Sequence, residues 1–112
     1  MDKTVLDNLI VELKRGTQVL AVLSQLKKNQ YGYSLLQALE EKKVFIEPGT
    51  LYPLMRRLES QGLLISEWDT TESRPRKYYR LSDEGLKIYG LLIQEWQQMT
   101  DDMNRLLVEE QR

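Results

Sequence analysis

The stretch 50-TLYPLMRRLESQGLL-64 determines the fold that the sequence predicts. At about 100° per residue, four apolar side chains fall on one face of a helix, namely Leu51, Leu54, Met55 and Leu58. The opposite face carries Tyr52, Pro53, Arg56 and Ser60. Because proline has no amide hydrogen, Pro53 is expected in the first turn, which places the N-cap near Thr50. Gly62 suits the left-handed position just after the helix.

Two further helices are predicted before this one. Apolar residues at helical spacing predict a first helix from Val5 to Leu26. Gly16 lies inside it, where the missing side chain would let another helix approach closely or let this helix bend. A second helix is predicted from Gly32 to Lys43, because its apolar positions also share one face. Phe45 to Glu47 are predicted to form a short strand, since the residue before Pro48 favours extended geometry.

A β-hairpin and a long helix are predicted after it. Leu63 to Asp69 and Arg76 to Ser82 are rich in apolar and aromatic residues, and a polar tip separates them. Trp68 is expected to pack this hairpin against a helix. Ser82 is expected to cap a last helix that runs to about Glu110, a length of roughly 45 Å.

This order of elements is that of a winged helix-turn-helix. The predicted fold class is therefore mainly α with a small β-hairpin, a winged helix-turn-helix followed by a long C-terminal dimerisation helix. Residues 1–81 are expected to form the DNA-binding domain, including the N-terminal helix, and residues 82–112 the dimerisation helix. In this fold the third helix enters the major groove and the hairpin reaches along the backbone.

The outward face of the third helix is the first candidate DNA contact. Arg56 can make a bidentate contact with guanine, and Tyr52 can bond phosphate or base, while Arg57 lies on the flank. An ordinary solvated face with surface arginines is the alternative.

The second strand of the hairpin is the other candidate, because it gathers Arg74, Arg76, Lys77 and Arg80 without an acid. Alternation puts Arg76 and Arg80 on one face and Lys77 on the other, so the charge is expected to follow a phosphate ridge. Arg74, near the tip, is expected to reach the minor groove. The alternative is an edge strand that charge protects from aggregation.

The last helix carries a wide apolar stripe. Its seam consists of Leu86, Tyr89, Ile93, Trp96, Thr100, Met103 and Leu107. This is more apolar surface than one small domain can cover, so we predict a homodimer. Trp96, with Ile93, Met99 and Met103 nearby, either packs inside the dimer contact or forms the wall of a cavity for an aromatic or apolar effector.

Composition narrows the function classes. The 112 residues include no cysteine and no histidine, the commonest metal ligands and neutral-pH bases, so neither an enzyme, a metal site nor a cofactor is expected. The net charge is only −1, but residues 50–81 hold six basic and four acidic side chains, which suits a polyanion there. With no membrane span and no signal peptide, a cytoplasmic protein is expected.

Three stretches resemble signatures of the PadR family of bacterial transcriptional regulators: YGYSLLQAL (31–39), PGTLYPLMRRLESQGLL (48–64) and RPRKYYRLSDEG (74–85). The single C-terminal helix is similar to the short subfamily, which includes a multidrug-binding repressor of lactococci. The resemblance implies a dimeric winged-helix repressor of detoxification, efflux or stress genes, which binds double-stranded operator DNA.

The resemblance also implies roles for single residues. Its DNA-facing positions correspond to Thr50, Tyr52, Arg56, Arg76 and Lys77 in this chain, and Tyr33 is a further candidate DNA contact. Its first and last helices form the dimer, which would place at the interface Leu6, Leu9, Leu13, Tyr89, Ile93, Trp96, Met103 and Leu107. Trp96 is similar in position to a tryptophan that stacks on planar drugs. The rival hypothesis is a protein-interaction module that binds no specific DNA.

Overall fold

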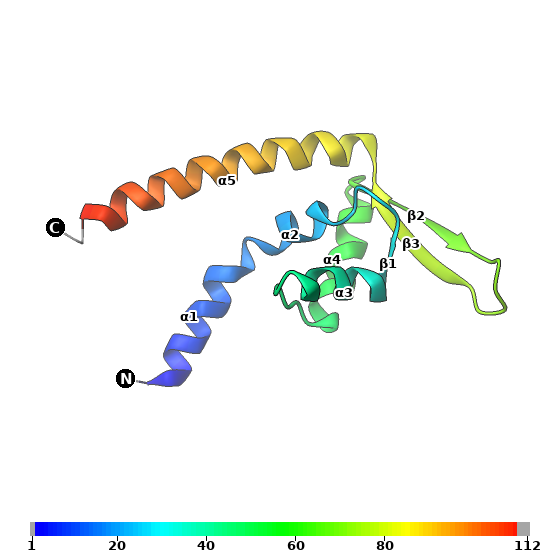
Figure 1. Cartoon of the computed structure of the whole chain (residues 1–112), viewed down its shortest axis with the longest axis horizontal. Helices are drawn as coiled ribbons and strands as arrows, with labels where there is room; N and C mark the ends of the chain where they lie inside the picture. Colours follow the sequence, from blue (N-terminus) through cyan, green and yellow to red (C-terminus); the bar gives the residue numbers. More distant parts are fainter. Residues whose placement is uncertain (1, 110–112) are drawn as a thin grey trace.

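Figure 1 shows the computed structural model of the chain, in which residues 2–109 are described. Its helices and strands are, in chain order, α1 (Lys3–Arg15), α2 (Gln18–Ser24), β1 (Gln30–Tyr31), α3 (Gly32–Glu41), α4 (Pro48–Ser60), β2 (Leu64–Asp69), β3 (Arg76–Leu81) and α5 (Asp83–Glu109). The predicted fold class is confirmed: the chain is mainly helical, with a small antiparallel sheet and a long C-terminal helix. The predicted end of the last helix near Glu110 lies outside the described residues.

The hydrophobic core lies between α2, α3 and α4, and the sheet closes it. Its fully buried side chains are Val22, Leu23, Leu26, Leu35, Leu51, Met55 and Leu58. Leu64 of β2 and Tyr79 of β3 complete it from the side of the sheet. Burying a leucine or methionine stabilises the fold by roughly 1.5–3 kcal/mol. Packing therefore fixes which face of α4 points outward.

The sheet has three strands in the order β1-β3-β2, all antiparallel. Gln30 and Tyr31, for which the sequence predicts no strand, pair with Tyr79 and Tyr78. The strand predicted at residues 45–47 is wrong, because these residues form no regular secondary structure, and Ile46 inserts its side chain into the core, where it is only 8% exposed. The edge of β3 that does not pair with β2 is occupied by β1. Residues 45–47 therefore pair with no strand of the described chain.

The first predicted helix is not continuous, since it breaks at Gly16 into α1 and α2. The hydroxyl of Thr17 donates a hydrogen bond to the carbonyl of Lys14 at 2.7 Å, and the Thr17 amide bonds the same oxygen at 3.1 Å. A threonine can satisfy backbone groups locally in this way and so compete with continuation of the helix. The break frees α1 from the core, and none of its residues is buried.

The helix α4 starts three residues earlier than predicted. Glu47 is the N-cap and Pro48 the first helical residue, where the fixed φ of proline suits a helix start. Both Thr50 and Leu51 donate backbone hydrogen bonds of 2.9 Å to the Glu47 carbonyl. Pro53 consequently lies inside the helix, beyond its first turn. Gly62 has φ +81°, which confirms its predicted left-handed position after the helix.

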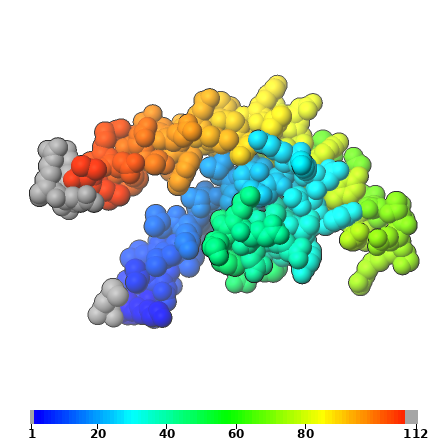
Figure 2. Space-filling model, in the orientation of Figure 1, coloured from blue at the N-terminus to red at the C-terminus, as the bar shows by residue number. Residues whose placement is uncertain are grey.

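The long helix α5 begins against the domain and then leaves it. The amide of Gly85 donates to the Ser82 hydroxyl oxygen at 2.9 Å, and that hydroxyl donates to the Gly62 carbonyl at 2.6 Å, so the predicted cap at Ser82 is confirmed. A Cβ at Gly85 would lie 2.0 Å from the Leu63 carbonyl oxygen, so only glycine fits this approach. Figure 2 shows α1 and α5 leaving the domain on the same side and diverging.

Candidate nucleic-acid interface

The helix α4 separates a buried face from an exposed face, as its spacing predicts. Leu51, Leu54, Met55 and Leu58 are buried, whereas Thr50, Tyr52, Pro53, Arg56 and Arg57 are exposed. The ring of Tyr52 also lies against Gly32 at the start of α3, where an added Cβ would be 2.3 Å from the ring. Gly32 therefore allows Tyr52 to pack on α3 while the tyrosine remains partly exposed.

The arginines of α4 are not neutralised within the domain. Among the residues that the structure describes, neither Arg56 nor Arg57 forms an ion pair, and the same is true of Arg74 near the wing tip. A guanidinium that is exposed and has no carboxylate partner is available for bidentate contacts with a base or a phosphate. Tyr33, at the start of α3, is 69% exposed and also faces solvent.

The cations of β3, by contrast, each have a carboxylate partner. Lys77 Nζ lies 3.5 Å from Glu59 Oε1, which joins the wing to α4. Arg76 is 3.6 Å from Glu72, and its guanidinium lies 4.3 Å from the centre of the Tyr31 ring. In the remaining pair, Arg80 Nη2 is 3.6 Å from a carboxylate oxygen of Glu67. The strand that looks most basic in sequence is thus internally compensated.

A set of polar contacts holds the wing tip to β1. The Tyr31 hydroxyl donates a hydrogen bond of 2.7 Å to Asp69. The hydroxyl of Thr71 donates a hydrogen bond of 2.7 Å to the same carboxylate. The backbone amide of Thr71 donates another, of 3.0 Å, to that carboxylate. The Thr71 hydroxyl, Tyr31 and the Thr71 amide together lower the pKa of Asp69 to about 2, because they stabilise its charged form. The hydrogen bond between Tyr31 and Asp69 also raises the pKa of Tyr31, and burial of the hydroxyl adds to that shift.

Comparisons with known proteins agree with this geometry. The family model described as the transcriptional regulator PadR-like family matches residues 19–91, most of the chain. The chain belongs to this family. PadR-family regulators bind DNA, so a DNA-binding transcriptional regulator is the class that the fold and the family share.

Three similar proteins illustrate the match. The solved structure of a PadR family transcriptional regulator from Eggerthella lenta has a TM-score of 0.87 and 50% identity, and covers 94% of each chain. That of a transcriptional regulator from Clostridium thermocellum has a TM-score of 0.78 and 31% identity, over 84% of this chain and 96% of the other. A transcriptional regulator of Mycobacterium tuberculosis is 37% identical over 66% of this chain and 70% of its own length. All three are transcriptional regulators.

Within residues 2–109, no helix is both long and apolar enough to cross a membrane. In the same range, no group of acidic side chains is arranged to hold a metal ion.

Trp68 does not pack as the sequence predicts. Its side chain is 63% exposed, so the expected packing of the sheet against a helix is wrong at this residue. The face of β2 that carries Trp68 does meet α4, through the hydrogen bond from Ser66 to Glu59. However, α4 ends at Ser60, and the strand continues beyond the helix before it reaches Trp68.

The residues predicted for the dimer interface and the effector site are mostly exposed in the single chain. Exposed side chains on α1 and α5 include Leu6, Leu9, Leu13, Trp96, Met99, Met103 and Leu107, while Ile93 is half-buried. Tyr89 instead packs against the core of its own domain, with Lys27 Nζ 5.4 Å from its ring centre. In the described part of the chain, two hollows lie on the winged-helix domain, and Trp96 lines neither.

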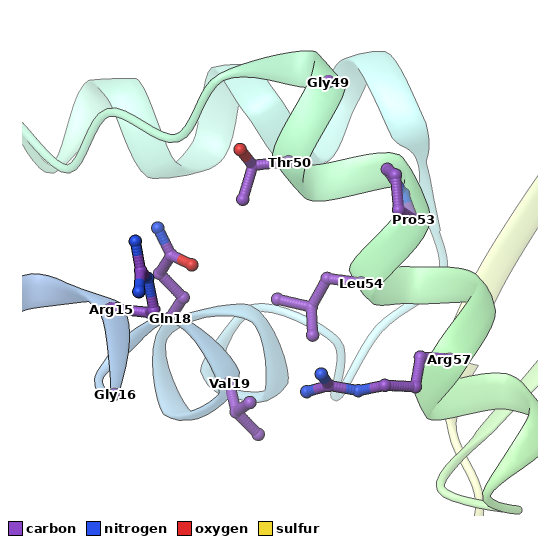
Figure 3. A pocket seen from close by; sticks show the side chains of 9 residues that line it. All are labelled: Arg15, Gly16, Gln18, Val19, Gly49, Thr50, Pro53, Leu54 and Arg57. Atoms are coloured by element: carbon purple, nitrogen blue, oxygen red, sulfur yellow. The ribbon is translucent and has the colours of Figure 1, made fainter. Parts of the chain in front are cut away.

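Sequence reasoning missed two features of the interface region. One is Glu59, whose role depends on β2 and β3 lying against the end of α4. The other is a hollow of about 560 Å³ between the α1–α2 bend and α4. Figure 3 shows the side chains of Arg15, Gln18 and Arg57 extending into this space. Arg15, Gly16 and Gln18 at the break line it, and the apolar spacing of the first helix does not report what faces them across the space.

Proposed function

We propose that this PadR-like chain is a homodimeric transcriptional repressor that binds a palindromic operator in a sequence-specific way. The observation that carries the proposal is the outward face of α4. Its arginines are exposed and make no ion pair in the described structure, while the opposite face is locked into the core. A rigid helix with free bidentate donors is suited to reading base edges in the major groove.

The proposed contacts fall into two groups. Base and phosphate contacts come from α3 and α4, through Tyr33, Thr50, Tyr52, Arg56 and Arg57. Backbone contacts come from the wing, through Arg74, Arg76 and Lys77. Since Arg76 and Lys77 already face carboxylates, their contribution to affinity is smaller than that of Arg56.

The dimer is supported by apolar surface on α1 and α5 that the single chain leaves uncovered. Residues 82–112 serve as the dimerisation helix, and residues 1–81 as the DNA-binding domain to which α1 belongs. A two-fold dimer would present two α4 helices to half-sites about 34 Å apart, one turn of B-DNA. Sedimentation should then give twice the 13.3 kDa of one chain.

A binding experiment tests the operator proposal. The full chain is titrated against its own upstream DNA and against the same DNA with scrambled half-sites, at several salt concentrations. We expect tighter binding to the intact site and a steep fall in affinity with salt, because phosphate contacts release counterions. Equal, salt-insensitive binding to both DNAs, or none at low salt, would instead favour the protein-interaction module.

We further propose that an aromatic or apolar effector binds between the α5 helices of the dimer and weakens DNA binding. The support is Trp96, which is 45% exposed beside Met99 and Met103. A planar molecule between two tryptophans would favour one spacing of the recognition helices over another. Titration of planar dyes should quench the emission of a Trp68→Phe variant, in which Trp96 is the remaining tryptophan. Unchanged emission with every dye would argue against the site.

A further inference from the structure

The hollow between α2 and α4 brings together Thr50 and Arg57, from the proposed DNA contacts, with Arg15 and Gln18, which lie outside those contacts. Its lining residues are Arg15, Gly16, Gln18, Val19, Gly49, Thr50, Pro53, Leu54 and Arg57. They come from three helices, so the fold brings together side chains that are far apart in the chain. In Figure 3 the polar side chains occupy the space between α2 and α4.

The charge of this hollow is one-sided. Arg15 and Arg57 both line it, and no carboxylate is among its lining residues. Neither arginine forms an ion pair within the described part of the chain. Two guanidinium groups beside one space repel each other, and an anion placed between them removes that repulsion.

The kinds of donor narrow the class of anion. Besides the two guanidinium groups, the hollow offers the side-chain amide of Gln18 and the hydroxyl of Thr50. A carboxylate has two oxygens to accept from these groups, whereas a phosphate has three or four in a tetrahedral arrangement. The apolar side chains of Val19, Pro53 and Leu54 would contact the carbon part of an ester.

We propose that this hollow is a phosphate-binding site, in which Arg15 and Arg57 hold a phosphate group and Gln18 and Thr50 orient it. The group is either a backbone phosphate of DNA or part of a small phosphate ester. The first source rests on the proposed function, because Thr50 and Arg57 also belong to the flank of the recognition helix. The second source does not, since a small ester needs no DNA.

The decisive experiment is thermal unfolding of the full chain in sodium phosphate and in sodium chloride at equal ionic strength. Three proteins are compared: the unmodified chain, Arg15→Gln, and Lys14→Gln as a control that removes the same charge beside the hollow without lining it. The unmodified chain and Lys14→Gln should gain about 5–10 °C in melting temperature at phosphate ten times the dissociation constant. Arg15→Gln should lose this saturable gain.

Phosphate also stabilises folded proteins by exclusion from their surface, and that effect does not saturate. An equal gain in all three proteins would therefore overturn the proposal. No DNA is present in this assay, so its failure would leave the operator proposal untouched, and failure of operator binding would leave the phosphate site untouched.

DNA titration at several salt concentrations then identifies the source of the phosphate. If it belongs to DNA, Arg15→Gln should reduce the slope of log affinity against log salt by about 0.9 per subunit, one phosphate contact. If it belongs to a small ester, the slope should stay unchanged and inorganic phosphate should still protect the DNA-bound protein. Either result supports the site once the thermal assay shows it.

Discussion

The recognition helix α4 and the wing formed by β2 and β3 both carry cations that the sequence ranks as DNA contacts, yet the two regions hold these cations differently. Arg56 and Arg57 project from a helix whose other face is core, and no carboxylate pairs with them in the described structure. Arg76 and Lys77 project from a strand and face Glu72 and Glu59. Positive charge in a sequence is therefore not the same as positive charge available to phosphate.

The ion pairs of Arg76 and Lys77 have a small energetic cost for DNA binding. A surface ion pair is worth about 0–1 kcal/mol, so a phosphate can displace the carboxylate at modest cost. Arg76 and Lys77 therefore contribute less to DNA affinity than Arg56 and Arg57, which have no carboxylate to displace in the described part of the chain. Four predictions test this contrast, beginning with the packing that supports α4.

Leu58→Ala should produce the largest effect. Leu58 is 1% exposed, and removing a buried leucine side chain costs about 2–5 kcal/mol of unfolding free energy. Because Leu64 and Tyr79 share that core, the wing should unfold together with α4 in a single urea transition followed by circular dichroism. The exposed Ser60→Ala change on the same helix should stay within about 0.5 kcal/mol. A wing that melts separately would contradict the shared core.

Arg56→Ala and Arg76→Ala compare the two regions directly on operator DNA. Losing a bidentate base contact should cost about 1–3 kcal/mol per half-site, or roughly tenfold and more in affinity. Losing Arg76, which already pairs with Glu72, should cost less than about 1 kcal/mol. Fluorescence anisotropy measures the affinity of each variant for the operator, and the two losses of affinity are then compared. Unchanged circular dichroism checks that both variants are folded. A greater loss for Arg76→Ala would reverse the comparison.

The sequence predicts α4 better than the wing for a physical reason. Helical spacing alone separates the buried face of α4 from the exposed face, because the period of about 3.6 residues is local. Local chemistry also locates Gly62 and the Ser82 cap. These features need no knowledge of the neighbouring elements.

Several features that sequence reasoning missed depend on distant segments. β1 has only two residues, and it is a strand because β3 offers it an edge. Lys77 and Glu59 are 18 residues apart and meet only when the hairpin docks on α4. The exposure of Trp68 follows from where α4 ends, which no pattern around the tryptophan reports.

Glu59→Gln should strengthen DNA binding if Lys77 is held back by its carboxylate. Glutamine keeps an oxygen that accepts from Ser66 but loses the charge that pairs with Lys77. We expect a gain of roughly two- to fivefold in affinity, since the pair is worth at most about 1 kcal/mol. The salt slope should steepen by about 0.9 per subunit. Both changes are measured by anisotropy at several salt concentrations.

The double variant Glu59→Gln with Lys77→Gln is the control for this gain. If the gain came only from removing a negative charge near DNA, it would persist without Lys77. If Lys77 carries it, the double variant should return to the affinity of Lys77→Gln alone. A fall in affinity for Glu59→Gln itself would show instead that the ion pair positions the wing productively.

Asp69 offers the smallest effect, because it touches the polar anchoring of the wing and neither the core nor α4. Its pKa of about 2, against an ordinary 3.8, means that its charged form is stabilised in the folded chain. This stability is fully present above about pH 4 and is lost as the pH falls towards 2. The loss of unfolding free energy in Asp69→Asn, relative to the unmodified chain, should therefore vanish by about pH 2.

Tyr31→Phe removes one hydrogen-bond donor to Asp69, so a carbon-13 titration should find the Asp69 midpoint shifted upward from about 2. An unchanged midpoint would mean that Thr71 alone holds the carboxylate, and that the tip is anchored within itself and not to β1.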